Sequence, residues 1–236
     1  MGFLFVAWLF VGSLVAGVSA AFVPTDELMN GETIVADDFN GYNVGAFPEG
    51  WMAWRGDTNR ARRLYTIQEE HGNRYLHARD DGHSIIIRKE LRSWNPRQYP
   101  ILTWRWRARV LPRSGDERVA RTNDSATAVY VVLSENLFHI PKTLKYVWST
   151  TTPVGTIYRR SGIGRPYVIV LESGPTRLGT WVSETVNVYE DYQRAFGEKP
   201  PNRAVGLGVL TDGNATRSVS EGDYDDFVIR QRTEGL

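Results

Sequence analysis

The chain has 236 residues, and its 28 lysines and arginines nearly balance its 27 acidic residues, which leaves a net charge of +1. This balance gives no argument for binding nucleic acid or another polyanion. The absence of cysteine excludes disulfide bonds and thiolate metal sites, so a folded domain must rely on its own core, which a chain of this length can bury.

Residues 1–20 carry no ionised side chain and are mostly apolar. They end in Val18-Ser19-Ala20, small residues of the kind that a signal peptidase accepts. We interpret them as a secretory signal peptide that is removed after Ala20. The alternative is an uncleaved membrane anchor, for which the apolar run is slightly short. We therefore expect an exported protein, periplasmic or extracellular, with no membrane span after signal cleavage.

The rest of the chain reads as a loose lead-in at 21–31, one domain at 32–231 and a short tail at 232–236. Short runs of β-forming residues, separated by glycine-rich and aspartate-rich turns, predict about eleven strands. In chain order they are 32–39, 64–69, 74–79, 84–91, 99–110, 127–134, 144–149, 167–172, 180–186, 203–210 and 224–231. Many short strands at regular spacing are typical of an all-β protein, and we predict an antiparallel β-sandwich that is jelly-roll-like.

The predicted strand at 99–110 alternates with period two, which indicates one buried face. Its apolar face consists of Leu102, Trp104, Trp106, Ala108 and Val110. Its opposite face carries Arg105, Arg107 and Arg109, which we call the arginine ridge. Three like charges about 7 Å apart are energetically costly unless acidic residues, solvent or a ligand neutralise them. Two interpretations stay open: acids of neighbouring strands close the ridge, or its donors are free for a ligand.

One helix is predicted near 187–196, inserted between two late strands. Asn187 can cap it, and Glu190 follows three residues later, as in a capping box. Gly197 ends the helix, and Pro200-Pro201 prevents its continuation.

Several polar and aromatic residues fall in or beside strands that could flank the arginine ridge. Arginine and lysine donate to vicinal hydroxyls, while tyrosine and tryptophan rings offer stacking faces, and together these groups suit a saccharide groove. The candidate ligand-binding residues are Arg105, Arg107, Lys145, Tyr146, Trp148, Glu172, Trp181 and Asp191. The alternative is a polar outer face whose arginines pair with acids across strands.

The segment Glu221-Gly-Asp223-Tyr-Asp225 places a carboxylate at every second residue. In a strand these acids share a face at a spacing that suits the paired acids of a retaining glycosidase. Glu172, Asp223 and Asp225 are therefore the candidate catalytic residues of an alternative hydrolase hypothesis. We favour the simpler interpretation, in which this segment is an acidic turn that leads into an edge strand and no residue is catalytic.

Acidic residues also gather near the two ends of the predicted domain. Pairing of the first and last strands would bring Asp37 and Asp38 close to Asp225 and Asp226, with Asp212 in a nearby turn. Such a cluster must be neutralised either by arginines or by a hard cation, for which Ca²⁺ is the candidate cofactor.

Several segments, in this order and spacing, carry a family resemblance. They include Leu144-Lys-Tyr-Val-Trp-Ser149, Asn187-Val-Tyr-Glu-Asp-Tyr-Gln-Arg-Ala-Phe-Gly197 and Leu210-Thr-Asp-Gly-Asn-Ala-Thr216. The chain resembles the domain-of-unknown-function family 3047, an uncharacterised family of exported bacterial proteins. The resemblance implies a secreted β-rich bacterial protein and no known reaction. Relatives usually read Thr-Asp-x-Asp-Asn-Thr in the last segment, so this chain lacks one acid there, which weakens the metal hypothesis.

The outline, with Asp-Asp-Phe in its opening strand and Tyr-Asp-Asp-Phe in its closing one, is also loosely similar to jelly-roll carbohydrate-binding modules. We accordingly predict an exported protein that recognises a saccharide or glycan without catalysis, and we expect no nucleic-acid partner. One alternative is a glycan hydrolase that uses paired carboxylates. Another is a structural or partner-binding periplasmic protein, whose exposed face should be flat and apolar.

Overall fold

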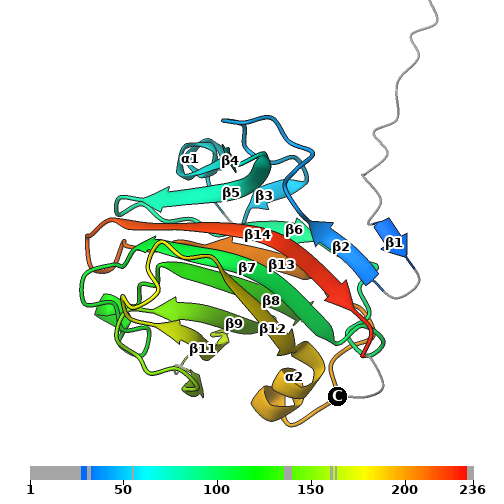
Figure 1. Ribbon diagram of the computed structural model, residues 1–236. Coiled ribbons are helices and arrows are strands. Elements are labelled where there is room, and N and C mark those ends of the chain that lie inside the picture. The colour runs from blue at the N-terminus through cyan, green and yellow to red at the C-terminus, as the bar shows by residue number, and fades with distance from the viewer. Residues whose placement is uncertain are drawn as a thin grey trace, which may run out of the picture.

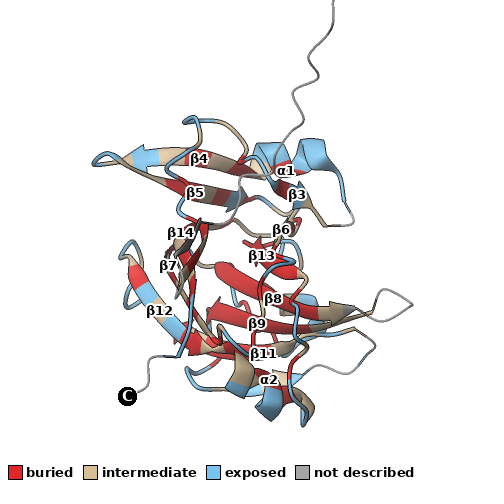
Figure 2. Ribbon diagram, turned by 90° about the vertical axis from the view of Figure 1, so that its right-hand side faces the viewer, coloured by how far each residue is buried: buried red, intermediate tan, exposed pale blue. Residues whose placement is uncertain are grey.

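The computed structural model describes residues 28–30, 33–54, 56–135, 140–159, 162 and 164–232. It is a β-sandwich of two seven-stranded sheets, called sheet A and sheet B below (Figure 1 and Figure 2). In Figure 2 the strands β7, β12 and β14 of sheet A lie on the left. The predicted signal peptide at 1–20 lies outside the described residues. No helix in the described part of the chain is long and apolar enough to cross a membrane.

Sheet A contains the first and last strands of the described chain. Its strands are β1 (Leu28–Asn30), β2 (Thr33–Asp37), β4 (Tyr65–Glu70), β5 (Asn73–Asp80), β7 (Ile101–Val110), β12 (Val182–Asn187) and β14 (Ser220–Arg230). The long strand β14 pairs on one side with β7 and on the other with β5 and then β2, all antiparallel. The strand β12 extends the sheet beyond β7.

Sheet B has the order β10-β11-β9-β8-β13-β6-β3. Its strands are β3 (Trp51–Ala53), β6 (Ile87–Glu90), β8 (Thr127–Glu135), β9 (Pro141–Ser149), β10 (Ile157–Arg159), β11 (Tyr167–Ser173) and β13 (Gly206–Leu210). The strands β11 and β9 are parallel, and every other pair in the sheet is antiparallel. The chain crosses between the sheets at β6–β7–β8 and again at β11–β12–β13–β14, which is the alternation of a jelly roll.

The core lies between the sheets and is rich in aromatic rings. Trp104 and Trp106 of β7 are fully buried, and their rings pack on Tyr146 and Trp148 of β9 at centroid distances of 5.5 and 6.3 Å. Alternation along β7 and β9 turns these four side chains toward each other. The predicted apolar face of β7 is confirmed from Leu102 to Ala108, and Figure 2 shows the buried residues concentrated on the facing strands.

Two helices flank the sandwich. The helix α2 (Val188–Phe196) confirms the predicted one: the Asn187 side chain accepts from the Glu190 N–H at 3.1 Å, and Gly197 ends the helix with φ 72°. The helix α1 (Thr58–Leu64) was not predicted. It is a seven-residue helix capped by Asp57, and it runs directly into β4.

All eleven predicted ranges contain a strand, whereas the three-residue strands β1, β3 and β10 were missed. The prediction of an acidic turn at Glu221–Asp225 is wrong, because these residues lie inside β14, which is paired on both sides. Gly222 lies at a register shift of β14, and a Cβ there would meet the Thr127 Cγ2 at 2.3 Å. Glycine therefore permits the close approach of the two sheets at this point.

Candidate functional site

The arginine ridge of β7 lies on the outer face of sheet A, where acidic residues of neighbouring strands form ion pairs with it. Arg105 contacts Asp225 at 2.6 Å, and Arg107 contacts Asp223 at 2.7 Å and Glu70 at 2.9 Å. Asp223 and Asp225 have no exposed side-chain surface. Of the two interpretations of the ridge, the structure therefore supports the closed one.

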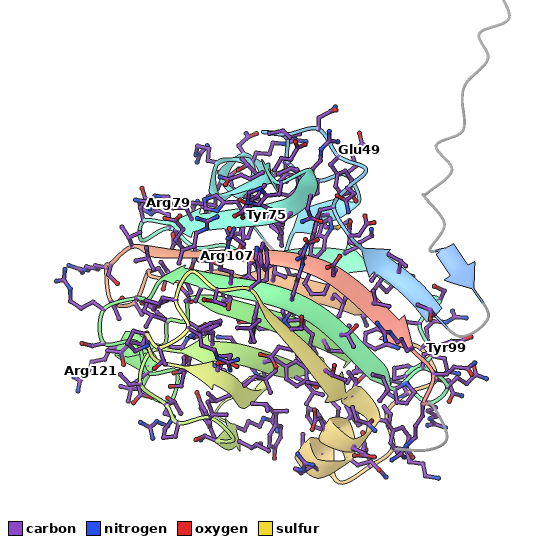
Figure 3. All side chains as sticks on the ribbon, viewed as in Figure 1. Glu49, Tyr75, Arg79, Tyr99, Arg107 and Arg121 are labelled. Atoms are coloured by element: carbon purple, nitrogen blue, oxygen red, sulfur yellow. The ribbon has the colours of Figure 1, made fainter. Side chains whose placement is uncertain are left out.

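Asp223 is the centre of this charged network. Besides Arg107, it accepts from Arg109 at 2.6 Å and lies 2.8 Å from the Nδ1 of His77. Trp181 covers the ridge, with its ring 4.5 Å from the guanidinium carbon of Arg107. Figure 3 labels Arg107 and Tyr75, which lie side by side on this face, and their cation–ring distance is 5.4 Å. These contacts describe a salt-bridged surface rather than a groove.

Most other predicted ligand-binding residues do not meet the ridge. Tyr146 and Trp148 point into the core between the sheets. The Tyr146 hydroxyl donates to Asp191 at 2.9 Å, and the Trp148 ring nitrogen donates to the Gly174 carbonyl at 3.1 Å. The groove predicted from Arg105, Lys145, Trp148 and Glu172 does not exist, because β7 and β9 belong to different sheets.

The alternative catalytic residues are likewise divided between the sheets. Glu172 lies in β11 of sheet B and pairs with Arg177. Asp223 and Asp225 lie on the outer face of sheet A, where arginines bind both. Glu172 therefore cannot form a catalytic pair with either aspartate. The pair Asp223 and Asp225 do share a face, as predicted, but both are enclosed by their ion pairs.

The predicted metal ligands do not come together either. As expected, β2 pairs with β14, with Asp37 opposite Phe227. However, Asp37 accepts from the Trp51 ring nitrogen at 2.8 Å and from Lys89 at 2.9 Å, while Asp225 and Asp226 are bound by Arg105. Asp38 caps its own turn, and Asp212 lies in the turn that follows β13 of sheet B. The described residues hold no cluster of three or more acids and histidines that could bind a metal ion.

The face of sheet B that points away from sheet A carries a cavity of about 280 Å³, which we call the Lys145 cavity. Its apolar part is a second hydrophobic cluster, separate from the core, and includes Tyr130, Val168 and Leu210. Its polar side chains are Asn123, Thr143, Lys145, Arg165 and Asp212, and Trp54 and Ile86 complete one side. A concave, mostly apolar site with a few converging polar groups is the usual form of a small-ligand site.

Lys145 reaches the cavity because β9 alternates. Leu144 and Tyr146 take the core face, so Lys145 takes the outer face of sheet B, where only 3% of it is exposed. Its ammonium lies 3.3 Å from the Ser125 hydroxyl and 5.5 Å from the centre of the Tyr130 ring. No carboxylate of the described residues lies within ion-pair distance of it. The ammonium is therefore a buried donor with capacity to spare.

Burial works to lower the pKa of Lys145, but Tyr130, Glu117 and Asp212 around it raise that pKa above its ordinary value. Lys145 is consequently a cation at neutral pH. Burial of Glu117 raises the pKa of its carboxyl, and the Ser149 hydroxyl donates to it at 2.6 Å. The cavity lining thus holds two cations, Lys145 and Arg165, and the acids around Lys145 act on it at a distance rather than in contact.

Asp212 supplies the acceptor of the same cavity. Burial raises the pKa of Asp212 to about 6, with a contribution from the nearby charge of Asp124, while Lys145 lowers it. At neutral pH the carboxylate is ionised, and it loses this charge under mildly acidic conditions. Among the described residues that line the cavity, Asp212 is the one carboxylic acid.

The turn that carries Asp212 is fixed from both sides. The Asp80 carboxylate accepts from the Gly213 N–H at 2.7 Å, and the Asp124 carboxylate accepts from the Thr216 N–H at 2.7 Å. A Cβ at Gly213 would lie 2.0 Å from the Ser218 carbonyl oxygen, so only glycine fits there. Asp80 and Asp124 are therefore positioning residues for Asp212.

The sequence pointed to Lys145 as a ligand-binding residue and to Asp212 as a metal ligand, without placing the two together. It did not single out Tyr130 or Thr143, which lie on the same side of β8 and β9. The Thr143 hydroxyl is buried and has no hydrogen-bond partner among the described residues. The one available signal was the alternation of β9, which places polar Thr143 and Lys145 opposite the aromatic core residues.

A family model described as "protein of unknown function (DUF3047)" matches residues 49–228. The family 11 carbohydrate-binding module of a cellulosomal cellulase of Clostridium thermocellum is similar at 8% identity, over 86% of this chain and 96% of that chain, with a TM-score of 0.45. Endoglucanase 3 of Trichoderma harzianum, from family GH12, is similar at 12% identity, over 86% and 100% of the two chains, with a TM-score of 0.43. No curated protein matches. Both structural likenesses are weak and concern the fold alone.

Proposed function

The chain belongs to the DUF3047 family, and we propose that it binds a neutral saccharide in the Lys145 cavity without chemically changing it. The observation that carries this proposal is a buried ammonium that has no carboxylate in contact and lies beside an aromatic ring. A sugar offers hydroxyls that accept from Lys145 and donate to Asp212, together with an apolar ring face for Tyr130 or Trp54.

The charges close to Lys145 favour a neutral ligand at that point of the cavity. Asp212 and Glu117 are acids near Lys145, and Asp124 lies near Asp212, while the second cation of the lining, Arg165, is exposed. A carboxylate or phosphate group of a ligand placed beside Lys145 would also meet the ionised Asp212, which repels it. Neutral hydroxyl groups can use donor and acceptor together, and this is the basis for choosing a neutral sugar.

Binding to immobilised glycans tests the proposal. The purified protein is applied to arrays of neutral and acidic plant, fungal and bacterial polysaccharides, and positives are measured by calorimetry. We expect retention on at least one neutral polysaccharide. Failure to bind any glycan on the array and in calorimetry would overturn the proposed function.

A glycan hydrolase is the second candidate, because a cavity acid with a pKa of about 6 suits a general acid. Glycoside hydrolysis generally uses two carboxyl groups on either side of the bond. Asp212 has no second acid beside it in the described lining. Incubation with the bound polysaccharide should therefore release no new reducing ends, and turnover that is lost in Asp212→Asn would favour the hydrolase.

Affinity should depend on pH through Asp212. Its ionised form accepts hydroxyl hydrogen bonds, so the affinity is expected to be constant above about pH 7 and to fall as the pH drops through about 6. Calorimetry between about pH 5 and 8 measures this profile. Asp212→Asn should bind more weakly at neutral pH and show a flat profile, whereas an unchanged profile in this variant would exclude Asp212 as the titrating group.

We also propose that the protein is exported through the signal peptide at 1–20. Expression of the full chain in a bacterial host should yield a mature protein that begins after Ala20 and fractionates outside the cytoplasm. A full-length protein in the cytoplasmic fraction would contradict this proposal.

A further inference from the structure

A second cavity of about 420 Å³ adjoins the Lys145 cavity. The two share Trp54, Ile86 and Leu210, and the second is completed by polar groups that include Ser84, Asp57 and Arg60. We call it the Arg60 cavity. Because three residues line both, the two cavities are neighbouring parts of one depression on the outer face of sheet B.

The lining residues show the direction of this depression. Val168, Lys145, Tyr130 and Leu210 come from the successive strands β11, β9, β8 and β13. Beyond them, Ile86 directly precedes β6 and Trp54 directly follows β3, and the Trp54 N–H donates to the Ile86 carbonyl at 2.8 Å. The depression therefore runs across the strands of sheet B rather than along them.

Its length follows from the spacing of the strands. Neighbouring strands lie about 4.8 Å apart, so the five steps from β11 to β3 span about 24 Å. This is much longer than one sugar ring. A single sugar in the Lys145 cavity would leave the far side of Trp54 without contacts.

The Arg60 cavity is chemically suited to continue the same ligand. Arg60 lies on the exposed side of α1 and has no ion-pair partner among the described residues. The Ser84 hydroxyl accepts from the Asn214 side chain at 2.8 Å and is itself a hydrogen-bond partner of Asp212, so it links the two cavities. Trp54 is half-buried and lines both cavities.

We propose that the ligand is an oligosaccharide chain of at least two linked units, which crosses sheet B and passes Trp54 from the Lys145 cavity into the Arg60 cavity. This inference rests on the proposed function and specifies its ligand as a segment of a polymer. The Lys145 cavity recognises one unit closely through Lys145 and Asp212. The Arg60 cavity, which is more open, contacts the units that follow.

Chain-length dependence tests the inference. The probes are β-1,4-linked gluco-, xylo- and manno-oligosaccharides of one to six units, with size-fractionated oligosaccharides of the polysaccharide that the array retains best. Calorimetry should show affinity rising at least about tenfold from one unit to four. Arg60→Ala should weaken binding of the longer oligosaccharides about two- to tenfold and leave the shortest unchanged.

Arg63→Ala is the matched control, because Arg63 is an exposed arginine of the same helix that does not line either cavity. Arg63→Ala should change neither the affinity for long oligosaccharides nor that for the shortest. Thermal melting checks that both variants are folded. Equal affinity for one unit and for six, or an unchanged affinity of Arg60→Ala for long chains, would overturn this inference alone. Absence of binding to every polymer and oligosaccharide would instead overturn the proposed function itself.

Discussion

Asp223→Asn is expected to lower the free energy of unfolding by about 3–5 kcal/mol, because it removes one partner of a buried charge network. The Asp223 side chain is fully buried. Its Oδ2 forms ion pairs with both Arg107 and Arg109, and its Oδ1 contacts His77. After the substitution, the guanidinium groups of Arg107 and Arg109 stay charged in a partly desolvated environment, without the carboxylate that neutralised them. Urea denaturation monitored by circular dichroism measures the change.

Asp226→Asn is the control for this measurement. Asp226 contacts Arg105 from the same strand β14, but 48% of its side chain is exposed, so its loss should cost less than about 1 kcal/mol. Asparagine also tolerates the positive φ of 54° at this position. If the two variants were equally stable, the ridge would not be held closed by Asp223. Folded Asp223→Asn should bind saccharide as the unchanged protein does.

Lys145→Met is expected to weaken saccharide binding about 10- to 100-fold, since a hydrogen bond from a charged donor contributes about 1.5–3 kcal/mol. Methionine fills similar space with an apolar chain and leaves Thr143 and Tyr130 in place. The loss of the ammonium also raises the pKa of Asp212, which Lys145 lowers. Calorimetry is therefore run at about pH 8, where Asp212 stays ionised in both proteins.

Lys142→Met controls for the removal of a lysine from the same strand. Lys142 lies three residues earlier in β9, is 43% exposed and pairs with Glu198 rather than with the cavity. It should bind saccharide normally. Undiminished binding by a folded Lys145→Met variant would show that the saccharide is held elsewhere.

Local pattern was sufficient to predict the sandwich. The alternation of β7 separates Trp104 and Trp106 from the arginine ridge, and this separation depends only on the two-residue period of a strand. The helix α2 was predicted because Asn187 and Gly197 mark its ends by local hydrogen bonding and backbone conformation. The helix α1 was missed because its seven residues show no apolar period long enough to separate it from the adjoining strand.

The candidate site depends on which strands become neighbours, and no local pattern specifies this. Arg105 and Lys145 both lie in alternating strands, and the sequence allowed them to share a groove. The structure places them on the outer faces of opposite sheets. The Asp212 turn is held near Lys145 by contacts with residues far away in the chain, among them Asp80 and Asp124, about 130 and 90 positions away.

A crystal structure of the protein with its bound oligosaccharide tests the central claim most directly. We expect the sugar chain on the outer face of sheet B, with one unit hydrogen-bonded to Lys145 and Asp212 and a later unit of the same chain beyond Trp54. A sugar bound on the outer face of sheet A, stacked on Trp181 above Arg105 and Arg107, would contradict the claim.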